Sequence, residues 1–239
     1  MATKDIYSAD LVKQFQYALD HDYGYIWGQA GDVWTATKQK NATRETTVKY
    51  GSRWIGHHVA DCSGLFHWAF AKLGGYMYHG SNTMFLKYTT SNGTLKAGKR
   101  TDGKGLKAGT AVFVWKESEK KYTHVGLYVG NGYVIEAAST QSGVIKTKVS
   151  NTKWTHWGEL KGVMYGDAPT PEPIPKGYAE VTGTKVALRS APTTQANVIT
   201  RVNTGELVKL ETEPPSEWSY VSYKNKTGYM MKKFLEEGK

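Results

Sequence analysis

Apolar residues return at helical spacing in two segments of the first 75 positions. The first segment follows Ser8, a residue type that often caps a helix N-terminus, and its apolar side chains recur every three or four residues. The second segment covers 62–73 with the same spacing and is followed by Gly74-Gly75, which is typical of a helix C-terminus. We predict one helix with Ser8 as its N-cap and a second helix over 62–73.

Strand-like runs follow in the middle of the chain. Segments rich in β-branched and aromatic residues occupy 110–115, 124–129 and 133–138. Helices that precede such strands in the sequence indicate an α+β domain, in which helices pack on an antiparallel sheet.

The prolines divide the chain. All seven lie at or after position 169, and four of them alternate with other residues up to position 175. Such a stretch favours an extended spacer. Beyond it, short turns separate strand-like runs at 186–189, 198–202, 206–210, 218–223 and 228–231, which is the pattern of a small all-β barrel. We therefore predict a first domain over 1–167, a Pro-rich linker over 168–176 and a second domain over 177–239.

The charge balance is basic. Thirty-one Lys and Arg residues oppose 21 Asp and Glu residues, which gives a net charge of +10. A basic protein is attracted to polyanions, such as nucleic acid or an anionic bacterial wall. The positive residues are scattered and form none of the usual nucleic-acid signatures, so we expect no nucleic acid as partner.

Neither a membrane span nor an export signal is expected. No run of about 18 apolar residues occurs, as a membrane-spanning helix would need. The first seven residues are polar and mixed in charge, unlike a signal peptide. We expect synthesis in the cytoplasm.

Cys62 is the single cysteine of the chain and stands in the motif Asp61-Cys62-Ser63-Gly64. One thiol can form neither an internal disulfide nor a zinc-cysteine cluster, so two interpretations remain: a small buried residue or a nucleophile. Asp61 is a good N-cap residue, which would place Cys62 in the first turn of the helix over 62–73. The backbone N–H groups there favour an anion, and this position favours the nucleophile.

Residues 124–138 read as a β-hairpin. We predict a three-residue loop at 130–132, which pairs Val129 with Tyr133 and Leu127 with Ile135. This register places six apolar residues on one face, as a half-buried hairpin requires. A two-residue turn at the same place would scramble the apolar face, so we expect the longer loop.

The opposite face of this hairpin carries polar chemistry. His124 and Glu136 are diagonal neighbours in the predicted register, and Gly126 opposite Glu136 leaves room for a ring. A carboxylate behind an imidazole fixes its tautomer and stabilises its charged form, as in catalytic triads. The alternative is that Glu136 is a solvated sheet residue. The other histidines lack metal-ligand spacing, so we expect no metal and no cofactor.

Three motifs together resemble the NlpC-type (New lipoprotein C) cell-wall cysteine peptidases. They are Tyr25-Ile26-Trp27-Gly28, Asp61-Cys62-Ser63-Gly64, and the run 124–132 with Glu136 twelve residues after the histidine. The resemblance covers about residues 10–165 and implies a papain-like fold.

The resemblance implies a role for each motif residue. Cys62 would be the nucleophile, its own N–H a candidate oxyanion donor, and His124 the base. Glu136 would take the third polar position, where histidine is more frequent in the family.

It also implies a substrate-binding set around the thiol. Tyr25 and Trp27 are expected to line the site, while Asp61 and Ser63 are expected to contact the amino end of the substrate.

The second domain, 177–237, resembles a bacterial SH3-like domain. The run 186–192 resembles its opening strand motif, and 218–221 and 227–230 resemble later strands. The resemblance implies binding to bacterial wall peptides.

The segment between Gly28 and Asp61 looks longer than is usual for the family. It contains Trp34, Trp54 and the basic residues Lys38, Lys40, Arg44, Lys49 and Arg53. We consider two interpretations: one wall of the substrate groove, or a tolerated surface insertion.

The resemblance implies a hydrolase that degrades the cell wall. We expect a thiol protease of peptidoglycan that cleaves a stem-peptide amide, γ-D-glutamyl to a diamino acid, through an acyl-enzyme. The alternatives are an N-acetylmuramoyl-L-alanine amidase or an acyltransferase on the same fold, or a catalytically inactive wall-binding protein. We expect peptidoglycan and anionic wall polymers as partners, and a bacteriolytic role as a phage or prophage endolysin.

Overall fold

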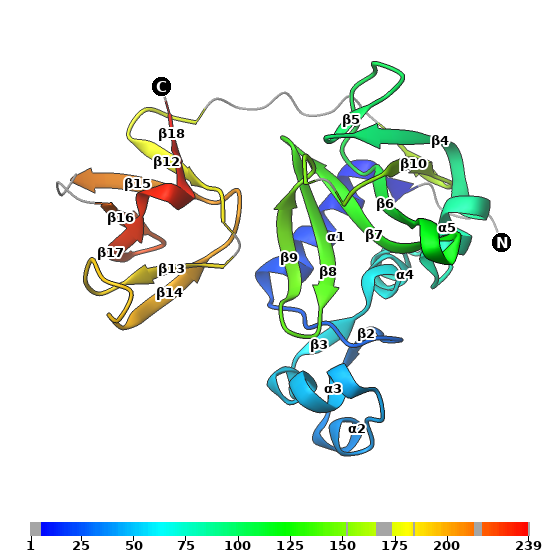
Figure 1. Cartoon of the computed structure of the whole chain (residues 1–239), viewed down its shortest axis with the longest axis horizontal. Coiled ribbons are helices and arrows are strands. Elements are labelled where there is room, and N and C mark those ends of the chain that lie inside the picture. Colours follow the sequence, from blue (N-terminus) through cyan, green and yellow to red (C-terminus); the bar gives the residue numbers. More distant parts are fainter. Residues whose placement is uncertain (1–5, 152, 166–173, 184, 213–216, 239) are drawn as a thin grey trace. The chain divides into compact units, whose positions relative to one another are not determined.

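The chain is built as two units, each with its own sheet, in the computed structural model (Figure 1). Residues 6–151, 153–165, 174–183, 185–212 and 217–238 are described. The units are Met1–Thr170 and Pro171–Lys239. Most of the predicted linker, residues 168–173, lies outside the described residues.

The first unit combines helices with a seven-stranded antiparallel sheet, of order β5-β4-β10-β6-β7-β8-β9. Its helices are α1 (Ser8–Asp20), α2 (Ala36–Lys40), α3 (Glu45–Tyr50), α4 (Cys62–Lys72) and α5 (Ser81–Tyr88), with 3-10 turns η1 (Gly51–Trp54) and η2 (Glu117–Glu119). The sheet strands are β4 (Thr89–Lys96), β5 (Lys99–Arg100), β6 (Ala111–Lys116), β7 (Lys121–Gly130), β8 (Tyr133–Ser139), β9 (Gly143–Lys148) and β10 (His156–Leu160). Two further pairs are β1 (Ile6–Tyr7) with β11 (Val163–Met164), and β2 (Ala30–Val33) with β3 (His58–Ala60). The α+β architecture predicted from the sequence is confirmed.

Helices α1 and α4 form the core with one face of the sheet. Phe15 of α1 and Phe66 of α4 are fully buried and meet edge to face, with ring centroids 4.7 Å apart. The apolar face of the β7–β8 hairpin closes the same core through Leu127 and Ile135. The positions that recur at helical and strand spacing in the sequence therefore bury one continuous surface.

The predicted cap of the first helix is wrong, although the helix begins where expected. Its N-cap is Tyr7, and Ser8 is the first helical residue. Ser8 is buried against Gly109, where a Cβ atom would lie 2.6 Å from the serine side chain. Tertiary packing, and not capping, explains a serine at this position.

The hairpin loop is also shorter than predicted. Gly130 pairs with Tyr133, so the turn contains only Asn131 and Gly132, both with positive φ angles of 51° and 78°. A bulge between Tyr128 and Gly130 then shifts the register by one residue. The bulge restores the pairing that the sequence predicts for the rest of the hairpin.

The consequence is that the predicted faces are correct. Leu127 pairs with Ile135. The opposite face is also buried, because Val134 and Trp154 belong to a second apolar cluster there. A Cβ atom on Gly126 would lie 2.8 Å from the ring of Trp154 and 3.2 Å from Glu136 Cβ, so the ring that uses the space above Gly126 is that of Trp154 and not, as predicted, that of His124.

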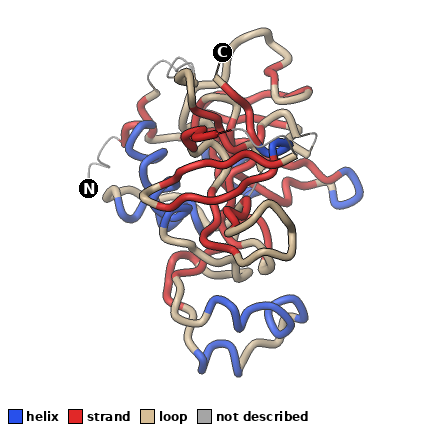
Figure 2. The backbone as a smooth tube through the Cα atoms, turned by 90° about the vertical axis from the view of Figure 1, so that its left-hand side faces the viewer, coloured by secondary structure: helices blue, strands red, loops and turns tan. Residues whose placement is uncertain are grey.

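The long segment between Gly28 and Asp61 forms a small lobe. Figures 1 and 2 show α2 and α3 together at one end of the first unit, beyond the β2–β3 pair. Trp34 and Trp54 are buried in a separate cluster with Ile26 and Val59. The insertion therefore has a core of its own.

The second unit is all-β. Its strands are β12 (Tyr178–Val181), β13 (Val186–Arg189), β14 (Val198–Val202), β15 (Leu207–Thr212), β16 (Trp218–Tyr223), β17 (Lys226–Met231) and β18 (Leu235–Glu237), with the 3-10 turn η3 (Lys232–Phe234). They form one sheet of order β14-β13-β17-β16-β15-β12-β18 around a buried aliphatic core. All five predicted strands are present, while β12 and β18 were not anticipated.

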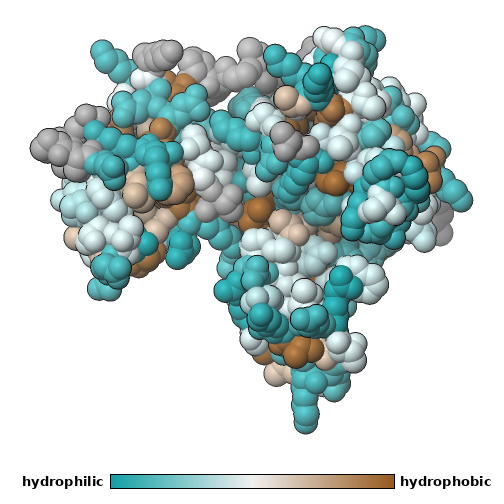
Figure 3. Space-filling model, in the orientation of Figure 1, coloured by the Kyte–Doolittle hydropathy of each residue, from teal (hydrophilic) through white to brown (hydrophobic). Residues whose placement is uncertain are grey.

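Hydrophobic residues on the face shown in Figure 3 form small separate areas among hydrophilic ones. Within the described part of the chain, no helix is long and apolar enough to cross a membrane.

Gly126→Ala tests the space behind the hairpin. The added methyl group would lie 2.6 Å from Val134 and 2.8 Å from Trp154, so we expect a loss of about 1–3 kcal/mol in the free energy of unfolding. Chemical denaturation measures this loss. Gly105→Ala is the control, because nothing lies within 4 Å of its added Cβ; an equal effect of both variants would contradict the explanation.

Candidate active site

The start of α4 places Cys62 in the first helical turn, as predicted. Asp61 is the N-cap, and its Oδ1 accepts a hydrogen bond from the Gly64 N–H at 2.8 Å. Cys62 is the first residue of the helix and is 8% exposed. Since the first N–H groups of a helix have no partner within it, the surroundings of the thiol favour negative charge.

Asp61 also joins the helix to two other segments. Its Oδ2 accepts the Gly28 N–H at 2.8 Å, and its Oδ1 lies 2.8 Å from His79 Nε2. Burial raises the pKa of Asp61, but the hydrogen bonds from His79, Gly64 and Gly28 and the charge of His79 outweigh this, so the pKa falls below 3.8. In the opposite direction, the hydrogen bond to Asp61 raises the pKa of His79 above 6.5, against the effect of burial.

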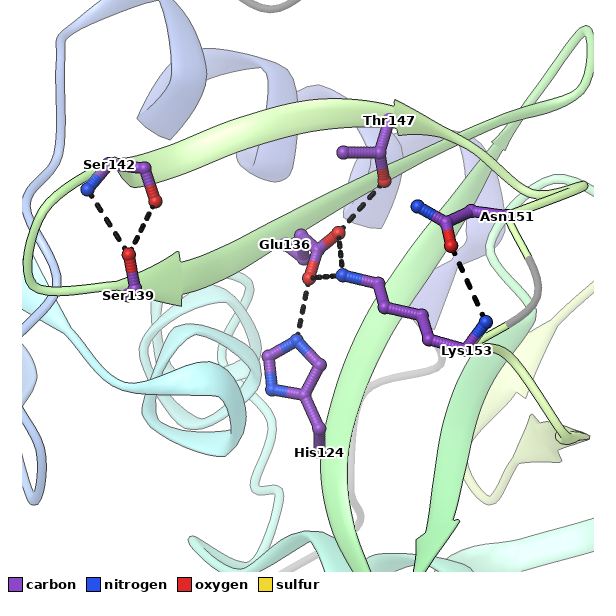
Figure 4. A network of polar contacts seen from close by, with 7 residues as sticks. All are labelled: His124, Glu136, Ser139, Ser142, Thr147, Asn151 and Lys153. Atoms are coloured by element: carbon purple, nitrogen blue, oxygen red, sulfur yellow. Dashed lines mark hydrogen bonds and ion pairs between the residues drawn. The ribbon is translucent and has the colours of Figure 1, made fainter.

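His124 and Glu136 face each other across the hairpin (Figure 4). Nε2 of the imidazole lies 2.6 Å from Oε2 of Glu136, whose side chain is completely buried. The structure therefore excludes the alternative in which Glu136 is a solvated sheet residue.

Two further donors hold the Glu136 carboxylate. Lys153 Nζ donates to both oxygens at 2.6 Å, and the Thr147 hydroxyl donates to Oε1 at 2.8 Å. Burial raises the pKa of Glu136, but the hydrogen bond and charge of His124 and the ammonium group of Lys153 outweigh it, so the pKa lies below 4.5. Glu136 is therefore an ionised buried carboxylate.

The other side of the imidazole meets the thiol. Burial lowers the pKa of His124, but hydrogen bonds to Cys62 and Glu136 and their negative charges raise it from 6.5 to about 9. Because Nε2 is engaged by Glu136, Nδ1 is the ring nitrogen left for Cys62. The three side chains thus form a continuous line from sulfur to carboxylate.

Trp154 fixes the plane of the imidazole. Its ring stacks on His124, with centroids 5.6 Å apart and planes 19° from parallel. Trp154 is 2% exposed and follows Lys153 directly in the chain. One short segment therefore holds both the ring of His124 and the carboxylate behind it.

Cys62 opens into a cleft of about 500 Å³. Every residue that the sequence analysis assigns to substrate binding contributes to its lining, namely Tyr25, Trp27, Asp61 and Ser63. Burial, reinforced by the nearby Cys62 and Asp61, raises the pKa of Tyr25. Ser63 is buried, and its hydroxyl donates to Asp61 Oδ1 at 3.2 Å.

One residue of the insertion also reaches the cleft. Arg44 lines it together with Trp27, and the guanidinium lies 4.8 Å from the centre of the Trp27 ring. Arg44 and Trp27 also line a neighbouring pocket of about 470 Å³ within the insertion lobe. One residue of the segment thus lines the cleft beside Cys62, and its role as a wall of a substrate groove stays a prediction.

Sequence reasoning missed two residues of this site. His79 lies 18 positions after Asp61, and Lys153 lies 17 positions after Glu136, both outside the motifs. No spacing rule connects either residue to its partner, because the fold alone brings them together. Within the described part of the chain, no group of three His, Cys, Asp or Glu side chains is arranged to hold a metal ion.

Comparison with known sequences places this geometry in a family. The sequence profile of the NlpC/P60 family matches residues 35–160, which is more than half of the chain. The chain belongs to the NlpC/P60 family. The profile of the bacterial SH3 domain matches residues 184–236, in the second unit. Both resemblances stated from the motifs are confirmed.

Individual relatives are more distant. The chain is 30% identical over 147 residues to the bifunctional muramidase/DL-endopeptidase CwlT of Bacillus subtilis, a match that covers 57% of this chain and 41% of that protein. The chain thus spans about two fifths of the length of this curated relative.

Solved structures of the family are similar to parts of the chain. The NlpC/P60 domain of the peptidoglycan hydrolase SagA has 16% identity and a TM-score of 0.43, covering 65% of this chain and 100% of that one. NlpC2 from Trichomonas vaginalis has 19% identity and a TM-score of 0.42, covering 67% of this chain and 48% of that one.

The Asp61–His79 pair of this NlpC/P60 chain predicts a pH-dependent stability. The lowered pKa of Asp61 adds fully to the free energy of unfolding above the unfolded pKa of 3.8. The raised pKa of His79 adds fully to it below the unfolded pKa of 6.5. The contribution of Asp61 is lost as the pH falls through its lower folded pKa, and that of His79 as the pH rises through its higher folded pKa.

We therefore expect His79→Gln to cost about 1–2 kcal/mol of unfolding free energy between about pH 4 and 6.5, and less above that window. Denaturant titrations over this pH range measure the difference. His67→Gln is the control, because its ring nitrogen lies 2.8 Å from the carbonyl oxygen of Met77 and has no such pair. A pH-independent effect of His79→Gln would contradict the assignment.

Proposed function

We propose that this NlpC/P60 chain hydrolyses a peptide bond in the stem peptides of bacterial peptidoglycan, with Cys62 as nucleophile. The observation that carries the proposal is the line from the Cys62 thiol, which opens into a cleft, through His124 to the buried Glu136 carboxylate. Such a line is the arrangement that nucleophilic catalysis needs: nucleophile, base, and a group that orients the base.

Each step of the reaction has a group in this line. The Cys62 thiolate attacks the peptide carbonyl, and the N–H of Cys62, at the start of α4, stabilises the oxyanion that forms. His124 protonates the leaving amine through Nδ1, which releases it and leaves an acyl-enzyme. His124 then accepts a proton from the water that attacks the thioester, which releases the carboxylic acid product and restores the Cys62 thiolate and the His124 imidazolium.

The cleft beside the thiol supports a substrate with a free amino end. Asp61 is ionised and lines this part of the cleft with Ser63 and Tyr25, so its negative charge favours a positively charged amino end there. Trp27, which is 59% exposed, adds an aromatic face to the lining of the same cleft. We assign the four residues to recognition of the peptide on the acyl side of the bond.

We assign the bond to the γ-D-glutamyl linkage before a diamino acid. The support is the similarity to CwlT, whose name describes a DL-endopeptidase. An N-acetylmuramoyl-L-alanine amidase on the same fold is the alternative, and the products distinguish the two.

The second unit is assigned to wall binding. Its SH3 profile match and a basic pocket of about 250 Å³ support this role; Lys185, Arg189, Arg201 and Trp218 are among the lining residues. Wall peptides and anionic wall polymers are the ligands we propose for it. A wall-bound unit raises the local concentration of the catalytic unit at its substrate.

Replacement of the nucleophile tests the chemistry. We expect Cys62→Ala to lower the rate of purified-wall hydrolysis by a factor on the order of 10⁴ or more, because no other group can form the acyl-enzyme. Turbidity of a wall suspension measures the rate. Equal turbidity loss by wild type and variant would contradict the proposal and favour a wall-binding protein without catalysis.

Mass spectrometry of the released fragments tests the bond. We expect new amino groups on the diamino acid and new γ-carboxyl groups on D-glutamate. New free N-terminal L-alanine would instead establish the amidase, because that enzyme cuts the bond to muramic acid.

Substitution of Arg44 tests the groove wall. We expect Arg44→Met to raise KM for a soluble stem peptide about tenfold with little change in kcat, since the residue contacts the cleft and not the reacting atoms. Steady-state kinetics measure both constants. Lys40→Met removes the same charge from an exposed position of the same lobe; an equal KM for both variants would assign the effect to net charge.

A further inference from the structure

The Glu136 carboxylate is a negative charge buried inside the protein. When Cys62 is a thiolate and His124 an imidazolium, their charges cancel, and Glu136 adds a negative charge with no exposed surface. An isolated buried charge is strongly unfavourable. The cluster therefore needs a cation beyond His124.

Lys153 is the residue that supplies it. Its Nζ lies 2.6 Å from both carboxylate oxygens, and its side chain is 34% exposed against 0% for Glu136. The ammonium group also lies 4.6 Å from the centre of the Trp154 ring. The backbone N–H of Lys153 also donates a long hydrogen bond of 3.4 Å to Asn151 Oδ1 (Figure 4).

We propose that Lys153 is a positioning residue of the active site, whose ammonium group keeps Glu136 ionised and aimed at His124 and makes the cluster of thiolate, imidazolium, carboxylate and ammonium neutral. The proposal rests on the roles assigned to Cys62, His124 and Glu136 under Proposed function. Lys153 touches neither the thiol nor the cleft and acts through the carboxylate.

The groups that face this cluster come from several elements. Asp61, which pairs with His79, and the Tyr25 hydroxyl line the cleft together with Cys62. Cys62 from α4 and Glu136 from β8 act on His124, while His124 from β7 and Lys153 from the segment before β10 act on Glu136. Thr147 of β9 adds a neutral hydroxyl group. Removal of the cation leaves a net negative cluster, which takes up a proton more readily.

The direction of the pH shift follows from this charge. Lys153→Met removes a positive charge, so the pKa values of the cluster rise and the reactive range of Cys62 moves to higher pH. Glu136→Gln removes a negative charge from the same cluster, so the reactive range of Cys62 moves to lower pH. The two variants thus shift the profile in opposite directions.

Alkylation of Cys62 by iodoacetamide is the measurement. Cys62 is the single cysteine, so one rate is read by mass spectrometry at each pH, whether or not the protein hydrolyses walls. If the wild-type protein does not hydrolyse walls but shows the expected alkylation profile, the proposed function is refuted while the proposal for Lys153 is not. The profile tests Lys153 separately.

We expect Lys153→Met to move the acid limb of the alkylation profile upward by about one pH unit, and Lys153→Arg to retain the wild-type profile. In the Glu136→Gln background, Lys153→Met should shift the profile much less, because the carboxylate through which Lys153 acts is absent. Lys161→Met, an exposed lysine of the same unit, controls for net charge and should leave the profile unchanged.

Two results would overturn the proposal. One is an unchanged profile for Lys153→Met with only a lower melting temperature, which would make Lys153 a structural residue. The other is a shift of equal size with and without Glu136, which would show that Lys153 does not act through the carboxylate.

Discussion

The pairing of β7 with β8 is the constraint on which the rest of the site depends. Side chains alternate along a strand, so a register shift of one residue would turn Glu136 away from His124 and into the apolar core. The two-residue turn by itself would produce that shift, and the bulge between Tyr128 and Gly130 reverses it. The apolar face that results packs against α1 and α4. Burial of the core and the approach of the Cys62 thiol to the imidazole are therefore consequences of one register.

The sequence predicts the parts of this arrangement whose signals are local. A capping residue before an apolar helix places Cys62, and the alternation of apolar residues gives the faces of the hairpin. No residue pattern in the sequence predicts the bulge. It is needed only because the two-residue turn and the apolar face of the hairpin would otherwise require different registers. Ser8 shows the converse case: a residue with a capping signal is buried against Gly109, and packing decides its position. His79 and Lys153 could not be predicted, because each lies in an irregular segment that tertiary structure brings to its partner.

The two buried carboxylates of the site are stabilised in different ways. Asp61 is held by backbone N–H groups of Gly28 and Gly64 and by one imidazole whose charge depends on pH. Glu136 is held by side chains, with a cation on one side and His124 on the other. The main effect of Asp61 is therefore to hold the start of α4 and the turn at Gly28 in fixed positions, since it binds both. Glu136 acts mainly on charge, since it raises the proton affinity of the imidazole that faces the thiol.

The insertion lobe between Gly28 and Asp61 is linked both to the strands that carry Glu136 and to the turn before α4. Trp54 of the insertion donates from Nε1 to the Thr140 carbonyl at 2.7 Å, and its ring leaves no room for a Cβ atom on Gly143, so the lobe is fastened to the β8–β9 turn. Trp27, which contacts Arg44 in the cleft, directly precedes the residue whose N–H binds Asp61 at the start of α4. The Arg44–Trp27 contact thus connects a lobe fixed to the strand of Glu136 with a turn fixed to the helix of Cys62. Under the proposed function, a peptide held between these two side chains would be positioned relative to both ends of the line from thiol to carboxylate.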